Sequence, residues 1–555
     1  MTAKTKVDIL IIGAGPTGLV LALSLLKQGI PPSSIRIIDK SVATVSTSRA
    51  LATQARTLEL YRSFSLTDEL LSHGHKVPAV NLWARGKHRA RIPFSEIGKE
   101  LTPYPFLFVL PQDQHERILE RALNENGAFV ERGVELVKFE DRDSHISACL
   151  RRNGAFPNND DGKNNETETE ICETTYLIGC DGAHSAVRHG MKVDFQGAPY
   201  KQLFYVADIE TDSDGQSPMI NGETHISYNG ADFILFIPYD QHRSVRLVGI
   251  LSPEGDQKDE AAANREYSFD DDVAPRVRNV LDLNVVKVNW FSTYRVHHRV
   301  ADHFRSGRVF LAGDAAHIHS PVGGQGMNTG IGDTINLAWK LALALKGHTT
   351  GAAGDERLFD SYNIERRAFA LQLVHSTDRA FSFITAEGLI ADTIRDWIVP
   401  LVVPAAFSFE GVREFMFQKV SQTEINYRDS PLAEEPKGMM QGTEKRTDPV
   451  HSGDRLPWVI KQGGGDNYDT FNAVKWQVHV YGTPTESLRQ WCQRKEIELH
   501  VFDWEEKYTS GGLKKDTVYL LRPDQYIAVI APFGAAAEEA TERLDRYLLE
   551  KGLNL

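Results

Sequence analysis

The clearest structural pattern in this chain is Val7–Asp39, VDILIIGAGPTGLVLALSLLKQGIPPSSIRIID. It opens with an apolar run, Val7–Ile12, in which Asp8 is the one charged residue, and such a run is typical of a strand buried on both faces of a parallel sheet. The glycine-rich turn GAGPTG follows, and Leu19–Lys27 then has the length and apolar content of a helix. Ile35–Ile38 is a second apolar strand, and it ends at Asp39. This order of strand, tight turn, helix and strand predicts a βαβ unit at the start of an α/β domain.

The glycines of the turn fit the binding of a dinucleotide. Gly13 permits the tight turn, Gly15 lets a pyrophosphate approach the backbone, and Gly18 lets the helix pack closely on the strand. The N-terminus of that helix attracts phosphate charge. Asp39 lies 21 residues after Gly18, where a carboxylate accepts hydrogen bonds from ribose hydroxyls and repels a 2′-phosphate. The pattern predicts FAD or NAD rather than NADP, with a ligand-free structural turn as the alternative.

A second motif, YLIGCDGAHSAVR, places Asp181-Gly182 directly after an apolar strand. The pair Asp-Gly is a common hairpin turn, and that is the alternative interpretation. The residues that follow have the pattern of a helix start rather than of a returning strand, with Ser185 and Arg188 on the first turns. The motif therefore predicts a loop that presents N–H groups and one cation to a ligand.

A third motif, LAGDAAHIHSPVGGQGMNTG, spans Leu311–Gly330. Gly313-Asp314 ends an apolar strand, and α/β proteins bind ligands at such strand ends. The glycines downstream remove side chains, so that backbone N–H groups can approach a flat ring at the start of the next helix. The residues expected at that ring are Gly324, Gly326, Met327 and Asn328. His317 and His319 are expected to pack or hydrogen-bond rather than bind a metal, because the loop does not complete a four-ligand set.

The length, net charge and cysteine content of the chain argue against several classes of protein. A chain of 555 residues forms more than one domain, and a net charge of −13 argues against a nucleic-acid partner. Its four cysteines form no CxxC pair, so neither a disulfide framework nor a zinc site is expected. The N-terminus lacks the pattern of a secretion signal, and the longest later apolar stretch, Ile398–Phe409, is too short and too rich in proline to span a bilayer. We expect a cytoplasmic protein without a membrane span.

Changes in pattern along the chain predict its domains. Residues 1–200 and 300–430 form a discontinuous, Rossmann-like α/β domain with a helical extension, and residues 201–299 form an inserted antiparallel-sheet domain that holds the substrate. Residues 151–170 are polar and are expected to form an exposed loop. Residues 450–555 have the order β-α-β-β-β-α, which suggests a thioredoxin-like domain.

Together, GAGPTG with Asp39, CDGAHSAVR, and GRVFLAGDAAHIHSP with GGQGMNTG resemble the single-component FAD-dependent aromatic hydroxylases. This group includes phenol hydroxylase and the polyketide-ring hydroxylases, and the resemblance covers nearly the whole chain. The segments GDRLPW, YDTF and LLRPD look like the thioredoxin-like domain of the phenol hydroxylase branch.

The resemblance implies roles for individual residues. Gly13, Gly15, Gly18 and Asp39 would bind the ADP half of FAD, and Arg49 and Gln112 would contact the flavin nucleotide. Asp181, Gly182 and Arg188 match a motif linked to both FAD and NADPH. Gly313-Asp314 would hold the ribityl chain, and Pro321 with the backbone from Gly324 to Asn328 would line the isoalloxazine. Tyr294 falls at a substrate-contacting tyrosine, with a packed strand tyrosine as the alternative. Leu51 replaces an aspartate of phenol hydroxylase, which points to an aromatic substrate other than simple phenol.

The same resemblance implies the reaction. NADPH would reduce FAD, O2 would add to the reduced flavin to give a C4a-hydroperoxide, and one oxygen atom would pass to a phenolic or polyketide-type ring while the protein excludes water. A Baeyer–Villiger oxidation or an epoxidation on the same fold is the enzymatic alternative. A non-catalytic escort protein is the alternative from another class, and the intact Gly313-Asp314 and GGQGMNTG argue against it. The resemblance is compatible with a homodimer.

Overall fold

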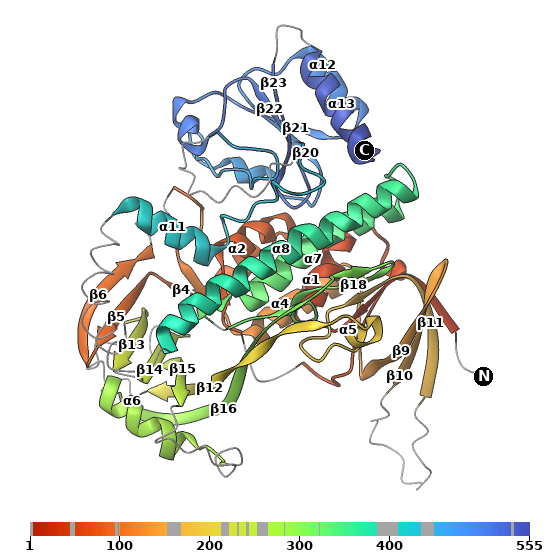
Figure 1. Ribbon diagram of the computed structural model, residues 1–555. Helices are drawn as coiled ribbons and strands as arrows, with labels where there is room; N and C mark the ends of the chain where they lie inside the picture. Colours follow the sequence, from red (N-terminus) through yellow and green to blue (C-terminus); the bar gives the residue numbers. More distant parts are fainter. Residues whose placement is uncertain are drawn as a thin grey trace.

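The computed structural model describes residues 4–44, 50–94, 98, 100–152, 168–211, 221–229, 232–239, 243–251, 265–281, 283–320, 322–385, 409–434, 449–533 and 538–555. The long helix α8 (Ala352–Thr385) runs across the molecule. Two large sheets lie on one side of it, and a C-terminal unit lies on the other (Figure 1).

The first sheet is built on the N-terminal motif. Strand β1 (Lys4–Ile12) pairs in parallel with β2 (Ile35–Asp39) and with β11 (Glu168–Gly179). The parallel run continues through β8 (Val130–Arg132) on one side and β18 (Val309–Leu311) on the other. The antiparallel strands of this sheet are β9 (Val134–Arg142), β10 (His145–Arg152) and β17 (Arg305–Ser306). Of the expected loop 151–170, residues 153–167 lie outside the described residues, and its two ends are strand rather than loop, because Arg151 and Arg152 belong to β10 and Glu168–Glu170 belong to β11.

Helix α1 (Pro16–Lys27) is buried along most of its length because it lies between the first sheet and two further helices. These are α4 (Gln112–Glu125) and α7 (Gly326–Leu345). The remaining helices of this region are α2 (Ala55–Tyr61), α3 (Thr67–His73), α5 (Ala186–Met191) and α11 (Glu410–Ser421). A small sheet joins β3 (Ala52–Thr53), β7 (Leu107–Val109) and β4 (His75–Val77).

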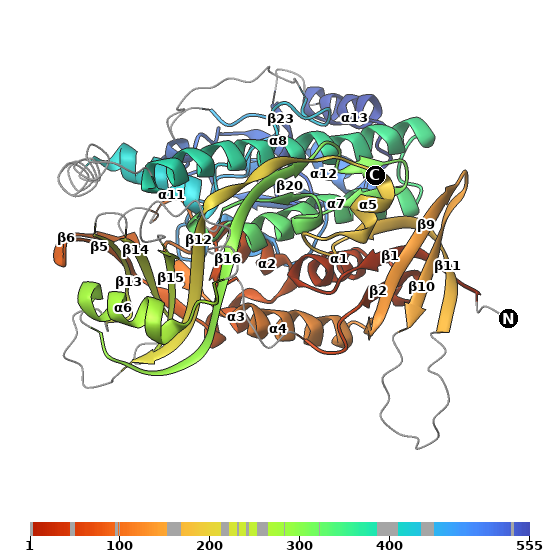
Figure 2. The ribbon, with the colours of Figure 1, turned by 60° about the horizontal axis from the view of Figure 1, so that its bottom comes forward.

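The second sheet is built around two long antiparallel strands, β12 (Phe195–Thr211) and β16 (Val285–Ala301). Both are bent by irregular register, and Figure 2 shows them curving away from the first sheet. The other members are β19 (His317–Ile318), β15 (Ser244–Leu251), β14 (Asp232–Pro238), β13 (Thr224–Asn229), β5 (Ala79–Ala84) and β6 (Lys87–Pro93). Strand β5 pairs in parallel with β13, so the sheet recruits residues from well before the expected range 201–299. Helix α6 (Ala274–Leu281) follows β15 in the chain.

The C-terminal unit has the order of elements expected from the sequence. Its sheet runs β21 (Glu498–Phe502), β20 (Gln477–Tyr481), β22 (Thr517–Leu521), β23 (Ile527–Pro532), with β20 and β21 parallel and the other pairs antiparallel. Helices α12 (Glu486–Arg494) and α13 (Glu539–Lys551) pack on it. Cys492 is buried on α12.

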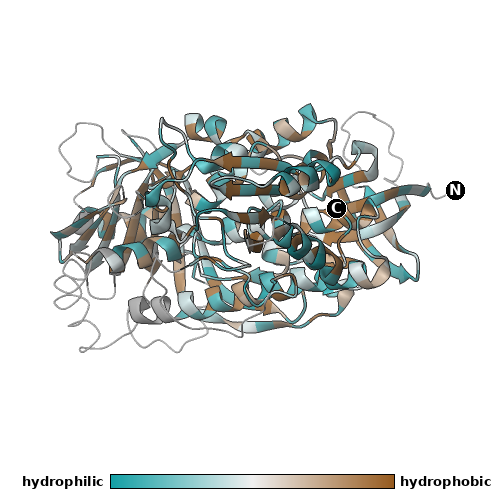
Figure 3. Ribbon diagram, turned by 90° about the horizontal axis from the view of Figure 1, so that it is seen from above, coloured by the Kyte–Doolittle hydropathy of each residue, from teal (hydrophilic) through white to brown (hydrophobic). Residues whose placement is uncertain are grey.

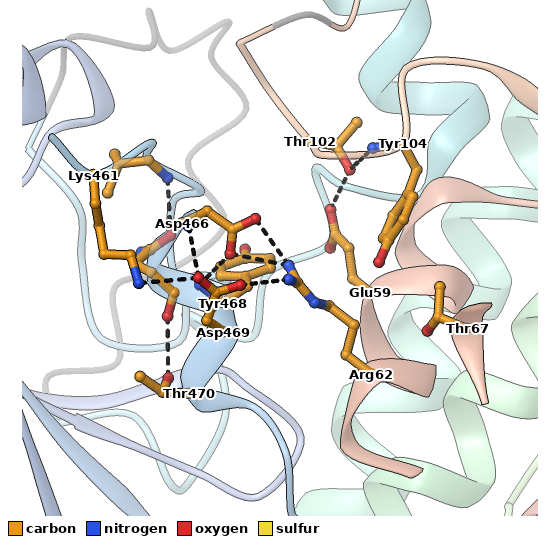
Figure 4. A network of polar contacts seen from close by, with 12 residues as sticks. Glu59, Arg62, Thr67, Thr102, Tyr104, Lys461, Asp466, Tyr468, Asp469 and Thr470 are labelled. Carbon is orange, nitrogen blue, oxygen red and sulfur yellow. Dashed lines mark hydrogen bonds and ion pairs between the residues drawn. The ribbon is translucent and has the colours of Figure 1, made fainter. Parts of the chain in front are cut away.

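Ion pairs fasten this unit to the region around α2. The guanidinium of Arg62 donates to both carboxylate oxygens of Asp466 at 3.0 Å and to Asp469 at 2.8 Å. Figure 4 shows this contact, with the carboxylate of Glu59 nearby accepting a hydrogen bond from Thr102. Arg455 also donates to Glu59, at 2.9 Å.

Apolar residues gather in the strands and in the helix faces between the layers, whereas polar residues dominate the outer turns (Figure 3). Among the described helices, none combines the length and the apolar character needed to cross a membrane. The stretch 398–408 lies outside the described residues.

Candidate active site

The loops after β1, β2, β11 and β18 meet at one edge of the first sheet. The ladder of backbone hydrogen bonds continues past the strand ends: the N–H of Gly13 donates to Ile38 and that of Cys180 donates to Ile12, both at 2.8 Å. The N–H of Ala312 donates to Gly179 at 3.0 Å. The three sequence motifs and Asp39 therefore lie side by side at the carboxyl ends of parallel strands, where ligands bind in folds of this class.

The glycines of the first loop differ in the space around them. Gly13 has φ +103°, and a Cβ there would lie 2.3 Å from the carbonyl oxygen of Cys180. A Cβ at Gly18 would lie 2.0 Å from the carbonyl oxygen of Gly13. At Gly15 the nearest atom would be 4.0 Å away, on the side chain of Glu116. Two glycines thus permit close packing, whereas the third leaves the N-terminus of α1 open to a ligand.

Two further predicted residues line this loop. The carboxylate of Asp39 accepts the N–H groups of Ala14 and Ser41, each at 2.8 Å. Gln112, at the start of α4, donates to Glu116 at 2.8 Å and accepts the N–H of Ala50 at 3.0 Å. Burial raises the pKa of Glu116, a carboxyl group that the sequence motifs do not single out. Arg49 lies outside the described residues.

The two carboxylate oxygens of Asp181 have different surroundings. One carboxylate oxygen accepts the N–H groups of Ala186 and Val187 at 2.7 and 3.3 Å, which caps α5. The other is buried and has no hydrogen-bond partner among the described residues, and burial raises the pKa of this group. Gly182, with φ +79°, has open space where a Cβ would lie. The loop thus holds a buried acceptor beside an unobstructed backbone.

Arg188 lies deeper than the sequence suggests. Its guanidinium is buried and donates to the carbonyl oxygens of Ala183 at 2.7 Å and Ala315 at 2.9 Å. It also lies over the ring of Phe195, 3.9 Å from the ring centre. This cation ties the second motif to the third, a contact between residues 127 positions apart that no local pattern reveals.

The third motif presents an aspartate on a rigid turn. Gly313 has φ +61°, and a Cβ there would lie 2.7 Å from the hydroxyl of Thr17 on α1. Its N–H donates to the carboxylate of Asp333 at 2.9 Å. Asp314 follows, and its side chain is exposed at the strand edge. A Cβ at Gly330 would also lie 2.6 Å from the Thr17 hydroxyl, so α1 and α7 approach closely beneath this turn.

The glycine run that follows is clamped in place by Asn328, which is buried. Its side-chain oxygen accepts from the N–H of Gln54 and the hydroxyl of Thr57, and its amide donates to the carbonyls of Ala52 and Gly324, all within 2.9 Å. The side chain of Asn328 therefore fixes the loop, and the backbone at Gly326 and Met327 opens α7. A Cβ at Gly324 would lie 2.8 Å from Ala52. Pro321 lies outside the described residues.

Beneath the third motif lies Asp333, which the sequence motifs miss. It is fully buried and accepts from His317 at 2.7 Å and from Arg366 at 2.6 Å. Burial opposes its ionisation, but the charge of Arg366 and the contact with His317 outweigh burial and lower its pKa. Burial lowers the pKa of His319 to about 4, so this imidazole is neutral at pH 7. Within the described ranges, no three metal-ligating residues gather. A buried acid among the apolar positions of α7 is the sequence signal that could have revealed Asp333.

Tyr294 lies on β16, away from these loops. Its ring packs 5.9 Å from that of Phe204, in an apolar cluster with Ile250 and Val296. Burial raises the pKa of Tyr294 to about 12, and the nearby Arg246 opposes this shift only in part. Arg299, five residues further along β16, pairs with Ile318 at the third motif. The strand therefore connects the position of Tyr294 with the loops directly.

The residues at the sheet edge fit a flavin nucleotide. Two helix N-termini, those of α1 and α7, supply positive partial charge and backbone N–H groups for phosphate and ring oxygens. Gly15 provides the open approach and Asp314 an exposed carboxylate, and Asp181 provides a buried oxygen that has no hydrogen-bond partner in the described part of the chain. This donor and acceptor set suits an extended dinucleotide with hydroxyl groups along its length.

Comparisons with known proteins agree with this geometry. Residues 6–377 match the family described as FAD binding domain. The 6-methylpretetramide 4-monooxygenase of Streptomyces rimosus is 32% identical over 434 residues, which cover 77% of this chain and 71% of the relative. The pentachlorophenol 4-monooxygenase of Sphingobium chlorophenolicum is 29% identical over 459 residues, 81% of this chain and 75% of the relative.

A solved structure shares the fold over almost the whole length. The crystal structure of the flavin-dependent monooxygenase PieE, in complex with FAD and substrate, superimposes with a TM-score of 0.78 at 22% identity, covering 98% of this chain and 99% of PieE. The family match and the 32% identical relative carry the assignment, and the shared fold is consistent with it. The chain therefore belongs to the FAD-binding family of flavin-dependent aromatic monooxygenases, and it is an enzyme with FAD as its cofactor.

Proposed function

We propose that this enzyme uses NADPH and O2 to insert one oxygen atom into a phenolic or polyketide-type aromatic substrate. The observation that carries the proposal is the meeting of three glycine-containing motifs at the carboxyl edge of one parallel sheet. Relatives named for 6-methylpretetramide and pentachlorophenol support a ring as substrate. FAD supplies the chemistry that neither side chains nor backbone can perform, which is the activation of O2.

The proposal gives roles to this chain's own residues at the sheet edge. Gly13, Gly15 and Gly18 would shape the turn for the pyrophosphate, Asp39 would accept hydrogen bonds from the ribose hydroxyls, and Asp314 would accept them from hydroxyls of the ribityl chain. Gln112 and Asp181 border the nucleotide. The backbone from Gly324 to Met327, held by the Asn328 side chain, would line the ring, and the α7 N-terminus would stabilise negative charge there.

The proposal also gives a role to each domain. Residues 1–200 and 300–430 carry the Rossmann-like FAD-binding part, and residues 201–299, joined by β5 and β6, form the substrate sheet. The parallel and antiparallel order of β20 to β23, with α12 and α13, supports a thioredoxin-like unit in residues 450–555.

A cluster of basic side chains beside the second motif supports NADPH as the donor. His184 and Arg188 come from that motif, and His297, His298 and Arg299 come from β16. His297 and Arg299 lie two residues apart on β16 and therefore share one face of the strand. Burial lowers the pKa of His297, and Arg299, His298 and His184 lower it further, so this imidazole is neutral at pH 7 and the positive charge comes from the arginines. The Nε atom of Arg299 is buried without a hydrogen-bond partner in the part of the chain that the structure describes. In a chain of net charge −13, this local cluster suits the phosphates of a pyridine nucleotide.

Replacing Arg299 tests whether this cluster of basic side chains binds NADPH. Arg299→Met should weaken NADPH binding about tenfold, the cost of one charged hydrogen bond, and slow flavin reduction at limiting NADPH. Anaerobic stopped-flow reduction measures this, while the FAD content should match that of the wild type. Arg142→Met, at an exposed arginine paired with Glu140, is the matched control. Unchanged reduction kinetics in Arg299→Met would remove the cluster from the NADPH site.

Tyr294 can act on the substrate only as a protonated hydroxyl, because its pKa is raised to about 12. A hydrogen bond from this hydroxyl to the phenolic oxygen would favour loss of the phenolic proton and so activate the ring. Tyr294→Phe should lower kcat for phenolic substrates about tenfold, while reduction by NADPH in the absence of substrate stays normal. Tyr267→Phe, on the opposite, α6-covered face of the sheet, is the control. Equal turnover in both variants would leave Tyr294 as a packing residue.

The reaction class is tested by products. Purified protein with bound flavin should consume NADPH faster when a suitable ring is added, and mass spectrometry should find a product heavier by one oxygen atom with the ring intact. A lactone from a ketone would indicate Baeyer–Villiger oxidation, and an oxirane would indicate epoxidation. A colourless protein that cannot be reconstituted with FAD would overturn the proposal.

A further inference from the structure

A group of buried polar residues joins the C-terminal unit to the third motif. We call it the interdomain charge cluster, and its members are each at most 5% exposed: Asp333, Asn336 and Lys340 of α7, Glu365 and Arg366 of α8, Tyr427, and Arg522 and Asp524 from the loop between β22 and β23. The cluster lies outside the FAD-contacting residues proposed above. Charged groups at this depth are stable only when each has its partners.

On the side of the C-terminal unit, the cluster is centred on Arg522. Its guanidinium donates to both carboxylate oxygens of Glu365, at 2.8 and 3.0 Å, and to Asp524 at 2.6 Å. Asp524 also accepts from the amide of Asn336 at 3.2 Å, and Lys340 donates to Glu365 at 2.8 Å. The loop Arg522–Tyr526 thus inserts its charges between α7 and α8.

On the side of the sheet edge, the next residue of α8 continues the contacts. Arg366 donates to Asp333 at 2.6 Å and to the hydroxyl of Tyr427 at 2.8 Å. The ring centres of Tyr427 and Tyr526 lie 4.3 Å apart, and the guanidinium of Arg522 lies 5.1 Å from the centre of the Tyr427 ring. Asp333 in turn accepts the N–H of Gly313. An unbroken series of contacts therefore runs from Arg522 to the residue before Asp314.

Such a series transmits position because a buried charge tolerates little displacement. If the Arg522 loop moves, Glu365 and Tyr427 lose partners, and Arg366 then holds Asp333 less firmly. Asp333 fixes the Gly313 N–H on a turn with positive φ, where small shifts redirect the following side chain. The cluster is thus suited to setting the direction of Asp314.

We propose that Asp333 is a positioning residue for the flavin, and that the loop Arg522–Tyr526 sets its position through Arg366 and Tyr427. Through these contacts the C-terminal unit helps to hold the residues of the flavin site in place. The proposal rests on the proposed role of Asp314 toward the ribityl chain.

Two variants of the full-length protein test it. Tyr427→Phe removes one oxygen atom and should raise the Kd for FAD about tenfold, measured by flavin fluorescence on titration of the apoprotein. Asp333→Asn leaves the charge of Arg366 uncompensated, so it should raise the midpoint potential of the bound flavin, since positive charge favours the reduced anion. A residue with only a structural role would lower the melting temperature without shifting the potential.

Arg62→Met is the matched control, because it breaks the interface contact with Asp466 and Asp469 without touching the cluster (Figure 4). It should lower the melting temperature but leave the Kd and the potential of the flavin unchanged. If Tyr427→Phe and Asp333→Asn match this control, the inference is overturned. If Asp333→Asn does not fold, the Kd of Tyr427→Phe decides. A wild-type protein that binds no FAD would instead overturn the proposed function.

Discussion

Asp314→Ala should lose its flavin on purification. The exposed carboxylate at the end of β18 is the group that we propose accepts hydroxyls of the ribityl chain, and hydrogen bonds to a charged acceptor are worth about 1.5–3 kcal/mol. The Kd for FAD should therefore rise roughly 10- to 150-fold. Because the side chain is exposed, the melting temperature of the apoprotein should stay near that of the wild type.

Flavin absorbance per protein and titration of the apoprotein measure this effect. Asp314→Asn keeps an acceptor without the charge and should fall between the wild type and Asp314→Ala. Asp143→Ala, at an exposed aspartate in the turn between β9 and β10, is the control. Stoichiometric flavin in purified Asp314→Ala would show that this residue does not hold the cofactor.

The two glycines of the first loop should respond in opposite ways. At Gly18 a Cβ would lie 2.0 Å from a backbone oxygen, so Gly18→Ala must push α1 away from β1 and should lower the free energy of unfolding by about 1–3 kcal/mol or more. At Gly15 the Cβ has room, so Gly15→Ala should fold normally. The added methyl group would then occupy the approach of the pyrophosphate and abolish FAD binding.

Thermal unfolding of the two apoproteins separates these effects from flavin titration. Each variant serves as the control of the other, because both add the same methyl group within one turn. Wild-type FAD affinity in Gly15→Ala would mean that the pyrophosphate does not lie against this loop. A fully stable Gly18→Ala would contradict the tight contact between Gly18 and Gly13.

Local patterns predict the parts of this site that lie within one strand, turn and helix. The run from Val7 to Asp39 is of this kind, because each residue's role depends on near neighbours, and β1, α1 and β2 lie where the sequence places them. Relative placement of the motifs also follows, because carboxyl ends of parallel strands share an edge.

Contacts between distant residues are what the sequence does not reveal. Asp333 depends on Gly313 and Arg366, which lie 20 and 33 residues away, and no periodicity encodes such a partnership. The sequence around Arg188 predicts an exposed cation, but the side chain is buried and donates a hydrogen bond to the carbonyl of Ala315. The pairing of β5 with β13 joins two segments more than a hundred residues apart, which a linear division into domains overlooks.

The second sheet is assembled from separate segments of the chain, and this limits how its substrate specificity can be changed by exchanging segments with a relative. A chimera that grafts a relative's residues 201–299 onto this chain would place a foreign β13 against the native β5, and it would cut both long strands. A graft that respects the hydrogen-bond ladder carries four stretches together: 79–93, 195–251, 285–301 and 317–318. Recombination within this family is therefore constrained by the strand pairing rather than by the apparent borders along the chain.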